Sequence, residues 1–374
     1  MINIFQPSLG NEELHAISEV FASNWIGKGA KTAEFEKKFH EWLKNPSGNT
    51  YSINGCTSAL FQLIEIFDIK NGDEVILPTV SFIGAANAIA HTGAKPVFCD
   101  VDQRTLNATV ESIEEKITPK TKAVIVLHYG GYPCEMDAIL DLCKSKNIIC
   151  IEDAATSVAS VYKGKACGAM GDAGTWSFDA MKILVTGDGG MVHIKDDVIA
   201  EKFLKNSYLG LLSKSGISNS VDNKWWEFDI NCFGRRDIIN DITAAIGIEQ
   251  LKKLPGNIQV RKDIHTFYND AFKNNTHFLV PPELEEYMES SYYMYWIQME
   301  SEEERNALAN YLRKQDVYTT FRYYPLHQVP YFECNDHLPS AESASLKTLC
   351  IPMHQALTSE NVAYIADKIL KFWR

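Results

Sequence analysis

The sequence predicts an α/β protein built around a mostly parallel sheet. Between residues 73 and 194, short β-rich runs alternate with longer helical segments, which is the pattern of parallel βαβ units. Two runs, AVIVL at 123–127 and the apolar part of NIICI at 148–151, are continuously apolar, as expected of strands covered on both faces. We therefore expect a three-layer α/β/α large domain, followed by a smaller C-terminal α+β domain.

Six strands and four helices make up the expected large domain. The strands cover residues 74–77, 96–99, 123–127, 148–151, 173–178 and 190–194. The helices cover residues 57–67, 84–91, 110–117 and 135–146. Ligands of open parallel sheets bind at the carboxyl ends of the strands. Residues that follow the strands are therefore the first candidates for a functional site.

The pattern changes after about residue 195. A polar stretch over 195–224, helical and then loop-like, leads to a long helix expected over 238–254 and ended by Pro255. The remaining elements are a strand in 291–299, a helix over 302–315, a strand over 317–323, and a helix over 359–372 capped by Thr358. We expect a large domain over residues 1–250 and a small domain over 251–374.

Charge and composition exclude several classes of partner. The 374 residues include 36 Lys and Arg against 48 Asp and Glu, for a net charge of −12. With no Lys/Arg block, the chain lacks the basic patch that nonspecific nucleic-acid binding needs, and an anionic membrane would repel it. The apolar window over 75–94 contains Pro78, Asn87 and His91, which favours a buried strand and helix over a membrane span.

Neither a metal site nor a disulfide framework is expected. The nine cysteines are scattered, with no CxxC or CxxH pairing, which is typical of reduced thiols. The first residues, MINIFQPSLGNEEL, lack the basic stretch and apolar run of a secretory leader. We therefore expect a cytoplasmic protein.

Three strand-end and helix-start motifs carry candidate chemistry. Glu152 and Asp153 follow the apolar strand NIICI, where a buried carboxylate needs a cation or several donors; the alternative is that Asp153 caps the next turn. Lys182 has apolar flanks and precedes a glycine-rich turn, which favours a lowered pKa and a nucleophilic amine, against the alternative of a solvated lysine. The segment NGCTSA at 54–59 opens a helix, where free amides either bind phosphate or are simply capped.

Together these motifs indicate pyridoxal 5′-phosphate. A carbonyl-reactive lysine, a strand-end carboxylate and a phosphate-ready helix start match its aldehyde, ring nitrogen and phosphate. A family resemblance covers most of the chain, in NWIGKGAKTAEFEKKF, GDEVILPTVSFIGAANAI, ITPKTKAVIVLHYGGYPCEMDAI, IEDAA, GDAGTWSFDAMKILVTGDGGMV, NDITAAIGIEQLKKL and LCIPMHQALTSENV. In these segments the chain resembles the DegT/DnrJ/StrS sugar aminotransferases, which have the aspartate aminotransferase fold (fold type I).

The resemblance assigns roles to particular positions. It implies that Lys182 is the Schiff-base lysine, that Asp153 pairs with the pyridine nitrogen and that Phe82 stacks on the cofactor ring. The phosphate-binding positions it implies are Thr57, Ser58 and Ser177. Asp188 lies in the family's Gly-Asp-Gly-Gly turn after the lysine, and we include it among the substrate-binding candidates.

Several positions depart from the family pattern. Thr156 replaces a Gln that contacts the phenolic oxygen of the cofactor, and it has a shorter reach. Asp179 stands where His is common. An Asn that crosses a dimer to the phosphate is common after Gly234; here Arg236 or Asn240 is the candidate, and a surface salt bridge is the alternative for Arg236.

The resemblance implies a ping-pong transamination from L-glutamate to a nucleotide-linked 4-keto or 3-keto deoxyhexose, for a surface polysaccharide or a glycosylated metabolite. Arg322, for a pyrophosphate, and His327 are the candidate sugar-pocket contacts, and Trp225 and Trp226 serve either this pocket or packing. A homodimer with shared active sites is expected. Two alternatives stay open: a sugar 3-dehydratase, which would carry His in place of Lys182, and a non-catalytic regulator with a degenerate site.

Overall fold

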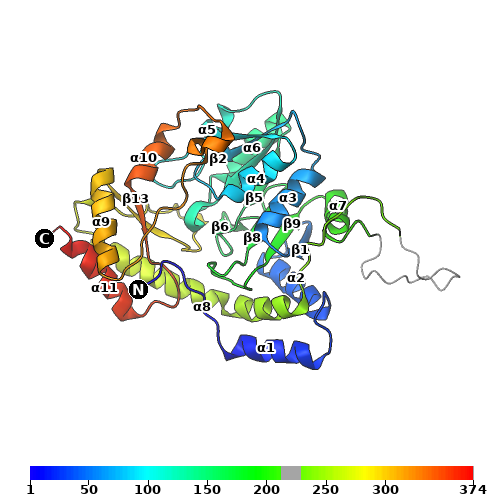
Figure 1. Ribbon diagram of the computed structural model, residues 1–374, viewed down its shortest axis with the longest axis horizontal. Helices are drawn as coiled ribbons and strands as arrows, with labels where there is room; N and C mark the ends of the chain where they lie inside the picture. Colours follow the sequence, from blue (N-terminus) through cyan, green and yellow to red (C-terminus); the bar gives the residue numbers. More distant parts are fainter. Residues whose placement is uncertain (212–228, 374) are drawn as a thin grey trace.

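The computed structural model describes residues 1–211 and 229–373. Its main sheet has seven strands in the order β1-β9-β8-β5-β4-β2-β3, in which β9 runs antiparallel to β1 and β8 and all other neighbouring pairs are parallel. The strands are β1 Asn49–Ile53, β2 Glu74–Pro78, β3 Lys95–Cys99, β4 Thr121–Leu127, β5 Ile149–Asp153, β8 Ala173–Ser177 and β9 Gly190–Ile194. The predicted α/β fold with a mostly parallel sheet is confirmed, and β1 is a strand that the sequence analysis missed (Figure 1).

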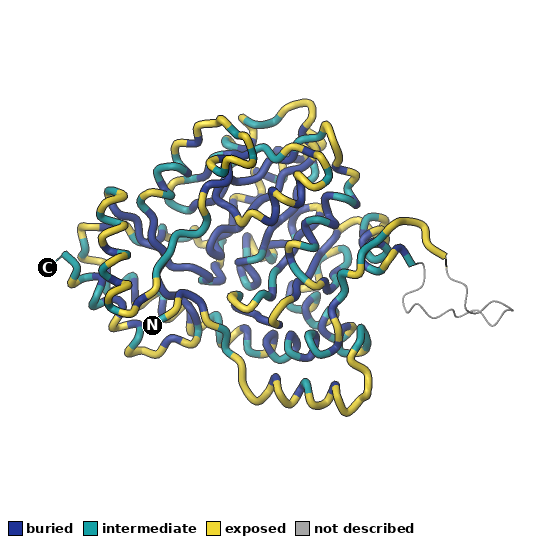
Figure 2. The backbone as a smooth tube through the Cα atoms, viewed as in Figure 1, coloured by how far each residue is buried: buried dark blue, intermediate teal, exposed yellow. Residues whose placement is uncertain are grey.

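Helices cover this sheet on both faces. They are α1 Asn11–Ala22, α2 Ala30–Trp42, α3 Cys56–Ile66, α4 Ile83–His91, α5 Val110–Glu114, α6 Met136–Lys146, α7 Asp197–Ser207 and α8 Asp241–Phe272. Alternate strand residues enter two different cores because successive side chains point to opposite faces. Val75 and Leu77 of β2 pack in the core shared with α2, α3 and α4, whereas Ile76 packs in the core shared with α5 and α6. The main sheet therefore forms the middle layer of three (Figure 2).

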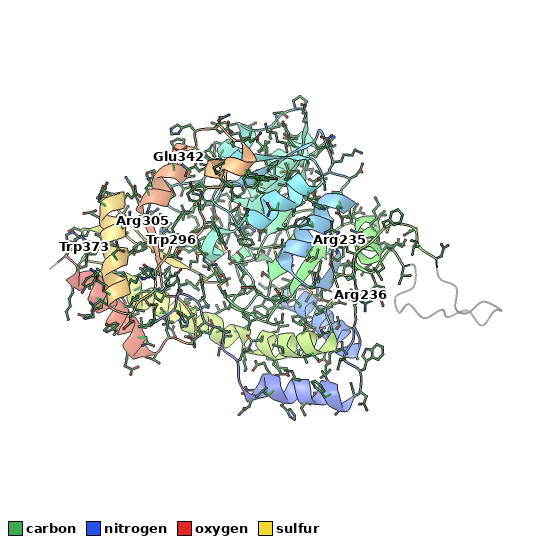
Figure 3. All side chains as sticks on the ribbon, in the orientation of Figure 1. Arg235, Arg236, Trp296, Arg305, Glu342 and Trp373 are labelled. Carbon is green, nitrogen blue, oxygen red and sulfur yellow. The ribbon has the colours of Figure 1, made fainter. Side chains whose placement is uncertain are left out.

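A second group of elements follows α8. It comprises β10 Phe278–Leu279, β12 Tyr295–Met299, α9 Glu302–Lys314, α10 Pro339–Lys347, β13 Thr348–Ile351 and α11 Ser359–Lys371. Strand β12 lies between two cores: Tyr295 and Ile297 pack with α9 and α11, while Trp296 packs in the large core (Figure 3). Two short strands, β6 Val161–Tyr162 and β7 Lys165–Ala166, pair with β11 Met288–Glu289 in a further small sheet. The chain segments before and after α8 are thus packed together.

Two expectations about this half of the chain are wrong. Helix α8 continues through Pro255, because Leu254 packs in the large core and Ile264 in the small one. This burial on both sides offsets the cost of about 3 kcal/mol for a proline inside a helix. The segment over 317–323 forms only isolated bridges, from Val317 to Ile2 and from Thr320 to Cys350. It pairs with the N-terminal segment instead of forming a full strand.

The predicted cap of α11 is confirmed, since Thr358 Oγ1 accepts a hydrogen bond from the Asn361 N–H at 3.2 Å.

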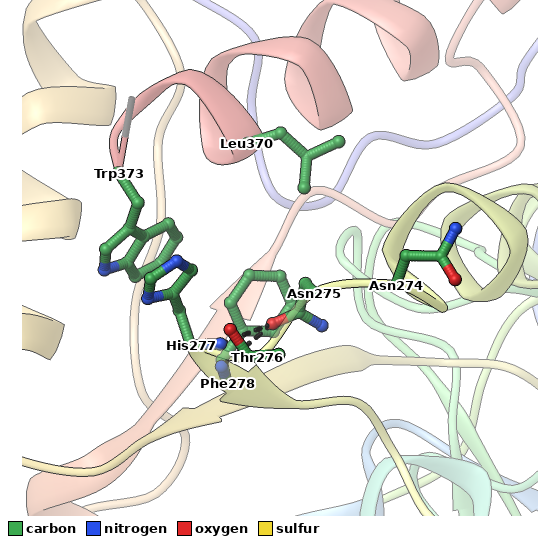
Figure 4. A pocket seen from close by; sticks show the side chains of 7 residues that line it. All are labelled: Asn274, Asn275, Thr276, His277, Phe278, Leu370 and Trp373. Carbon is green, nitrogen blue, oxygen red and sulfur yellow. Dashed lines mark hydrogen bonds between the residues drawn. The ribbon is translucent and has the colours of Figure 1, made fainter.

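A cavity of about 170 Å³ lies between the end of α8, β10 and α11 (Figure 4). His277 stacks there on Trp373, with ring centroids 4.9 Å apart. None of the predicted site residues lines this cavity. Within the described part of the chain, no helix is both long and apolar enough to cross a membrane.

Candidate active site

The predicted lysine and aspartate lie at the same edge of the main sheet. Asp153 is the last residue of β5, and it pairs in register with Thr175 of the adjacent parallel strand β8. Lys182 follows in the turn that leaves β8. The carboxyl ends of two neighbouring parallel strands therefore bring both residues to the place where this class of sheet binds ligands.

The two carboxylates at the end of β5 have different environments. Glu152 is fully buried, and its Oε2 atom lies 3.0 Å from Nε2 of His128. Its carboxylate also accepts hydrogen bonds from the backbone N–H groups of Gly168 at 2.7 Å, Met170 at 2.6 Å and Gly171 at 2.6 Å. Asp153 is 4% exposed, and its Oδ1 atom accepts one bond from the Ala155 N–H at 3.0 Å. Burial raises the pKa of Asp153, so this carboxyl gains most from a cationic partner.

Lys182 is half-buried, and its Nζ atom lies 5.1 Å from the ring centroid of Tyr293. Burial lowers the pKa of the lysine, but neighbouring groups outweigh it and the net pKa lies above the ordinary value. Those neighbours are Tyr293, Tyr323, Cys56 and Asp153. The expected lowering of the pKa is therefore wrong for this chain. The sequence shows the apolar flanks but not the four groups that the fold brings to the amine.

The start of α3 lies beside these residues with its amides accessible. Gly55 is the N-cap, and no side chain in the described residues caps this turn. Thr57 is exposed and Ser58 half-buried in the first turn. A Cβ atom at Gly190 would lie 2.9 Å from the Cys56 nitrogen, so the start of β9 approaches the helix closely. The uncapped N–H groups retain the partial positive charge that binds phosphate.

Phe82 lies at the start of α4, and 51% of its surface is exposed. Its ring centroid is 5.9 Å from that of Tyr323. A Cβ atom at Gly84 would lie 3.0 Å from Thr57 Oγ1 and 3.3 Å from Phe82 Cδ1. The aromatic ring and the phosphate candidates are thus neighbours, which the sequence separation did not reveal.

The end of β8 and the turn after it carry two further candidates, Ser177 and Asp188. Ser177 is half-buried, and its Oγ atom accepts a weak hydrogen bond from the Asp179 N–H at 3.4 Å. Asp179 itself accepts from the Met181 N–H at 2.9 Å, which shapes the approach to Lys182. Asp188 is exposed, and its carbonyl accepts a hydrogen bond from Thr186 Oγ1 at 2.7 Å.

Two predicted contacts are engaged within the chain. The Thr156 hydroxyl donates to the His128 carbonyl at 2.8 Å and is 3% exposed. His327 is 5% exposed, with Nδ1 2.7 Å from Thr79 Oγ1 and Nε2 3.1 Å from Glu342 Oε1. Both ring nitrogens of His327 therefore have protein partners, and direct contact with a substrate stays a prediction.

Arg322 and Arg236 contact different segments of the chain. Arg322 is half-buried and its guanidinium carbon lies 4.8 Å from the Phe5 ring centroid. Arg236 is exposed beside α7, with its guanidinium carbon 5.3 Å from the Tyr208 ring (Figure 3). Asn240 caps α8 by accepting from the Thr243 N–H at 2.9 Å. Trp225 and Trp226 lie outside the described residues.

Tyr293 and His128 are site neighbours that the sequence analysis did not single out. Tyr293 contacts Lys182 from just before β12, and His128 follows β4 and holds Glu152. In the run SYYMYWIQM a tyrosine has the pattern of a core residue, so only the tertiary packing shows that Tyr293 lies beside Lys182. His128 directly follows an apolar strand, and this strand-end position could have marked it as a site neighbour.

The residues at this edge fit pyridoxal 5′-phosphate. The amine of Lys182 matches the aldehyde, the buried carboxyl of Asp153 matches the ring nitrogen, the uncapped start of α3 matches the phosphate, and the exposed ring of Phe82 matches the pyridine face. Three layers around a mostly parallel sheet, with this donor set at its carboxyl edge, define a pyridoxal-phosphate enzyme of the aspartate aminotransferase fold.

Comparison with known proteins identifies the family. The model of the DegT/DnrJ/EryC1/StrS aminotransferase family matches residues 7–370, and the chain belongs to this family. The chain is thus an aminotransferase dependent on pyridoxal phosphate, as the sequence resemblance implied.

Relatives match over nearly the whole chain. The dTDP-4-dehydro-2,3,6-trideoxy-D-glucose 4-aminotransferase of Saccharopolyspora spinosa is 47% identical, with 99% of this chain and 96% of the relative covered. The aminotransferase TlmJ of Streptoalloteichus hindustanus has a TM-score of 0.95 and 46% identity over 100% of this chain and 99% of its own. The putative sugar aminotransferase Spr1654 of Streptococcus pneumoniae, in its PMP form, has a TM-score of 0.92 and 26% identity over 100% and 99%.

Proposed function

We propose that this aminotransferase transfers an amino group from L-glutamate to the 4-keto carbon of a nucleotide-linked deoxyhexose, with dTDP as the nucleotide. The placement of Lys182 and Asp153 at the ends of adjacent parallel strands carries the chemistry of the proposal. The 47% identity to a 4-aminotransferase of a dTDP-linked trideoxyhexose supports the substrate. Arg322 is a half-buried cation whose Nη2 atom contacts the sulfur of Met181, the residue before Lys182, and a cation at this position supports binding of an anionic substrate group.

Each residue has a proposed task. Pyridoxal phosphate supplies an aldehyde and an electron-withdrawing ring. Lys182 bonds to it covalently and, when freed by the donor, moves the proton of the reacting carbon through Nζ. Asp153 holds the ring nitrogen protonated, and Phe82 covers one ring face. The phosphate is bound by the amides at the start of α3 and by the hydroxyls of Thr57, Ser58 and Ser177.

The remaining contacts serve the substrates. We assign the phenolic oxygen of the cofactor to Thr156, and the sugar nucleotide to Asp188, Arg322 and His327. Thr79 and Glu342 would orient the His327 ring through their hydrogen bonds to it. For His327 to contact the sugar, one of these two hydrogen bonds must break. The lysine at position 182 disfavours a dehydratase of the His-bearing branch, and a complete donor set disfavours a regulator without catalysis.

The same proposal includes a homodimer in the cytoplasm, in which Arg236 of one chain reaches the phosphate of the other. Apolar side chains next to Arg236 are exposed, namely Leu209, Ile230 and Phe233. Exposed apolar groups around a cation favour a protein interface. We place the cofactor in a large domain, residues 1–250, and the closing surface in a small domain, residues 251–374. The proposed cellular role is to supply an amino sugar for a polysaccharide or for a glycosylated metabolite.

The test is a reaction of the purified protein with pyridoxal phosphate, L-glutamate and a panel of dTDP-linked and GDP-linked keto-sugars. Mass spectrometry of the sugar product distinguishes amine gain from the oxygen loss of a dehydratase. We expect an amine on the dTDP-linked 4-keto sugar. Lys182→Ala should lose both turnover and the visible absorbance of the bound cofactor. The control is Lys163→Ala, because Lys163 pairs with Asp137 on the surface. A wild-type protein without a cofactor band, or a Lys182→Ala variant with wild-type turnover, would refute the assignment.

A further inference from the structure

Three side chains stack in a column that ends at Lys182. The Tyr293 ring faces the lysine amine, at 5.1 Å from centroid to Nζ. Phe5 packs on Tyr293 with ring centroids 4.9 Å apart and planes 13° from parallel. The Arg322 guanidinium carbon lies 4.8 Å from the Phe5 centroid. We call Phe5 and Tyr293 the aromatic stack.

Tyr293 is held from several directions and has no exposed surface. Its N–H donates to the Gly130 carbonyl at 3.1 Å, and its carbonyl accepts from Nη1 of Arg261 at 3.2 Å. Its hydroxyl donates to the carbonyl of Met181, the residue before Lys182, at 3.3 Å. A ring fixed in this way has one position relative to the lysine, which is what a positioning group requires.

Arg261 is fully buried, and its hydrogen-bond partners among the described residues are all neutral. Besides Tyr293, it donates to the carbonyls of Tyr292 at 3.1 Å and Met353 at 3.0 Å, and to Gln355 Oε1 at 2.9 Å. A buried cation is costly, and burial lowers its pKa to about 10. Its hydrogen bonds connect α8 to the segment before β12 and to the segment after β13. The position of Tyr293 therefore depends on how these three segments pack together.

The N-terminal segment supplies the other half of the aromatic stack. The Ile2 carbonyl accepts from the Tyr318 N–H at 2.9 Å, and the Ile4 carbonyl accepts from the Met353 N–H at 3.3 Å. His354 Nε2 lies 3.2 Å from the Asn3 carbonyl. These bonds place Phe5, 8% exposed, against Tyr293. The first residues of the chain therefore support the Tyr293 ring that faces the lysine.

We infer that Tyr293 is a positioning residue for Lys182, that its ring face holds the ammonium form of the lysine amine, and that Phe5 sets the position of that ring. The inference rests on the role of Lys182 in the proposed function. When the freed amine takes the proton, the C–H bond of the substrate breaks, an N–H bond forms at Nζ, and the electron pair stays with the substrate carbon and the cofactor. The face of an aromatic ring within about 6 Å attracts the resulting cation.

Other charged or titratable groups face the same amine, and they define the controls. Asp153 approaches from β5, Cys56 from α3 and Tyr323 from the segment after α9. Asp153 contributes a charge, whereas Tyr293 offers its ring face. A variant that keeps the ring but removes the hydroxyl therefore separates the ring from hydrogen bonding and from tyrosine ionisation.

The experiment measures the protonation of Lys182 in the cofactor-free protein. Competitive acetylation with acetic anhydride, quantified by mass spectrometry from about pH 8 to about pH 12.5, covers a lysine whose pKa lies above the ordinary value, and it reports protonation by the midpoint of the rate profile and access by its plateau. We expect Tyr293→Leu to lower the Lys182 midpoint by about one unit, because the ring face is lost. Tyr293→Phe should keep the wild-type midpoint. Phe5→Leu should lower it less than Tyr293→Leu, and Phe5→Tyr should restore it.

The matched control is Tyr295→Leu, which removes another buried tyrosine of the same segment. The Tyr295 hydroxyl donates to Asn269 Oδ1 at 2.7 Å and not to a residue next to Lys182. This variant should leave the Lys182 midpoint unchanged.

A second readout is the single-turnover reaction with L-glutamate deuterated at Cα. Its rate should fall roughly tenfold in Tyr293→Leu, with little change in KM. An equal midpoint in the wild type and Tyr293→Leu, or equal shifts in Tyr293→Phe and Tyr293→Leu, would overturn the inference. If Tyr293→Leu does not fold, Tyr293→Phe and Phe5→Leu decide it. Neither readout uses a sugar, so failure of the proposed substrate leaves this test intact.

Discussion

Glu152 and Asp153 are adjacent in the sequence, yet they belong to different parts of the molecule. The Glu152 carboxylate accepts three backbone hydrogen bonds from residues 168, 170 and 171 and contacts His128, all within the protein. The Asp153 carboxylate accepts one bond, from Ala155, at the edge where Lys182 lies. Because successive side chains of a strand point to opposite faces, the protein engages one carboxylate with several donors, and its neighbour keeps acceptor capacity for the cofactor that the proposed function places there.

This pair predicts opposite effects of two isosteric substitutions. Asp153→Asn should fold normally, because the amide oxygen still accepts from Ala155, but turnover should fall roughly 10- to 1000-fold with the loss of charge at the ring nitrogen. Glu152→Gln should lower the free energy of unfolding by about 2–4 kcal/mol, because its amide cannot serve the same donors. Urea denaturation and steady-state rates check both. Wild-type turnover in Asp153→Asn would contradict the assignment.

Phe82 is exposed by half of its surface, so its removal should affect cofactor binding more than folding. Phe82→Ala should weaken pyridoxal phosphate affinity roughly 3- to 10-fold through the lost ring contact, with a nearly unchanged melting temperature. Phe82→Trp keeps an aromatic face and should bind like the wild type. Equilibrium titration of the bound-cofactor absorbance measures both. Equal affinities in the alanine variant and the wild type would show that Phe82 does not cover the ring.

Two neighbouring arginines allow a matched test of the phosphate contact. Arg235 pairs with Glu65 in its own chain, whereas Arg236 is exposed over Tyr208. Arg236→Ala should weaken cofactor affinity roughly 10-fold or more through loss of a charge-assisted bond, and Arg235→Ala should not.

Asn240 is the alternative to Arg236 and has its own signature. Asn240→Ala should cost about 0.5–2 kcal/mol of stability, because Asn240 caps α8. A large loss of cofactor affinity in Asn240→Ala with none in Arg236→Ala would transfer the phosphate contact to Asn240. Cofactor titration and thermal melts of both variants separate these outcomes.

His193 should make stability depend on pH. Its ring is fully buried between Thr50 Oγ1, 3.0 Å from Nδ1, and the Ser47 carbonyl, 3.1 Å from Nε2, and burial lowers its pKa to about 4. The unfolded chain therefore binds the proton more readily, with a pKa of about 6.5. The stability contributed by neutral His193 is complete above about pH 6.5 and is lost as the pH falls toward about 4, by at most about 3 kcal/mol.

The measurement is urea denaturation over this pH range. His193→Gln should flatten the pH dependence by close to one proton, while His15→Gln, at an exposed position of α1, should follow the wild type. An unchanged slope in His193→Gln would assign the acid sensitivity to other groups.

The sheet could be predicted from the sequence because its signals are local. Runs such as 123–127 are apolar at every position, which is typical of a strand buried on both faces. Asp153 was singled out because it follows an apolar strand, and Lys182 because apolar residues flank it before a glycine-rich turn. Helix α8 could not be predicted in full, since the proline rule is local, whereas the packing of Leu254 and Ile264 that overrides it is not.

The sequence by itself determined the three layers, the family and the cofactor, because strand periodicity and motif order depend on neighbouring residues, and it predicted which lysine binds that cofactor. The tertiary structure alone decided how differently the two carboxylates of β5 are bonded, that Phe5 packs on the Tyr293 ring that faces Lys182, and that neighbouring groups raise the pKa of that lysine. These features join residues from both ends of the chain. Burial, ring contacts and electrostatic coupling act through distances in space, which separation along the chain does not specify.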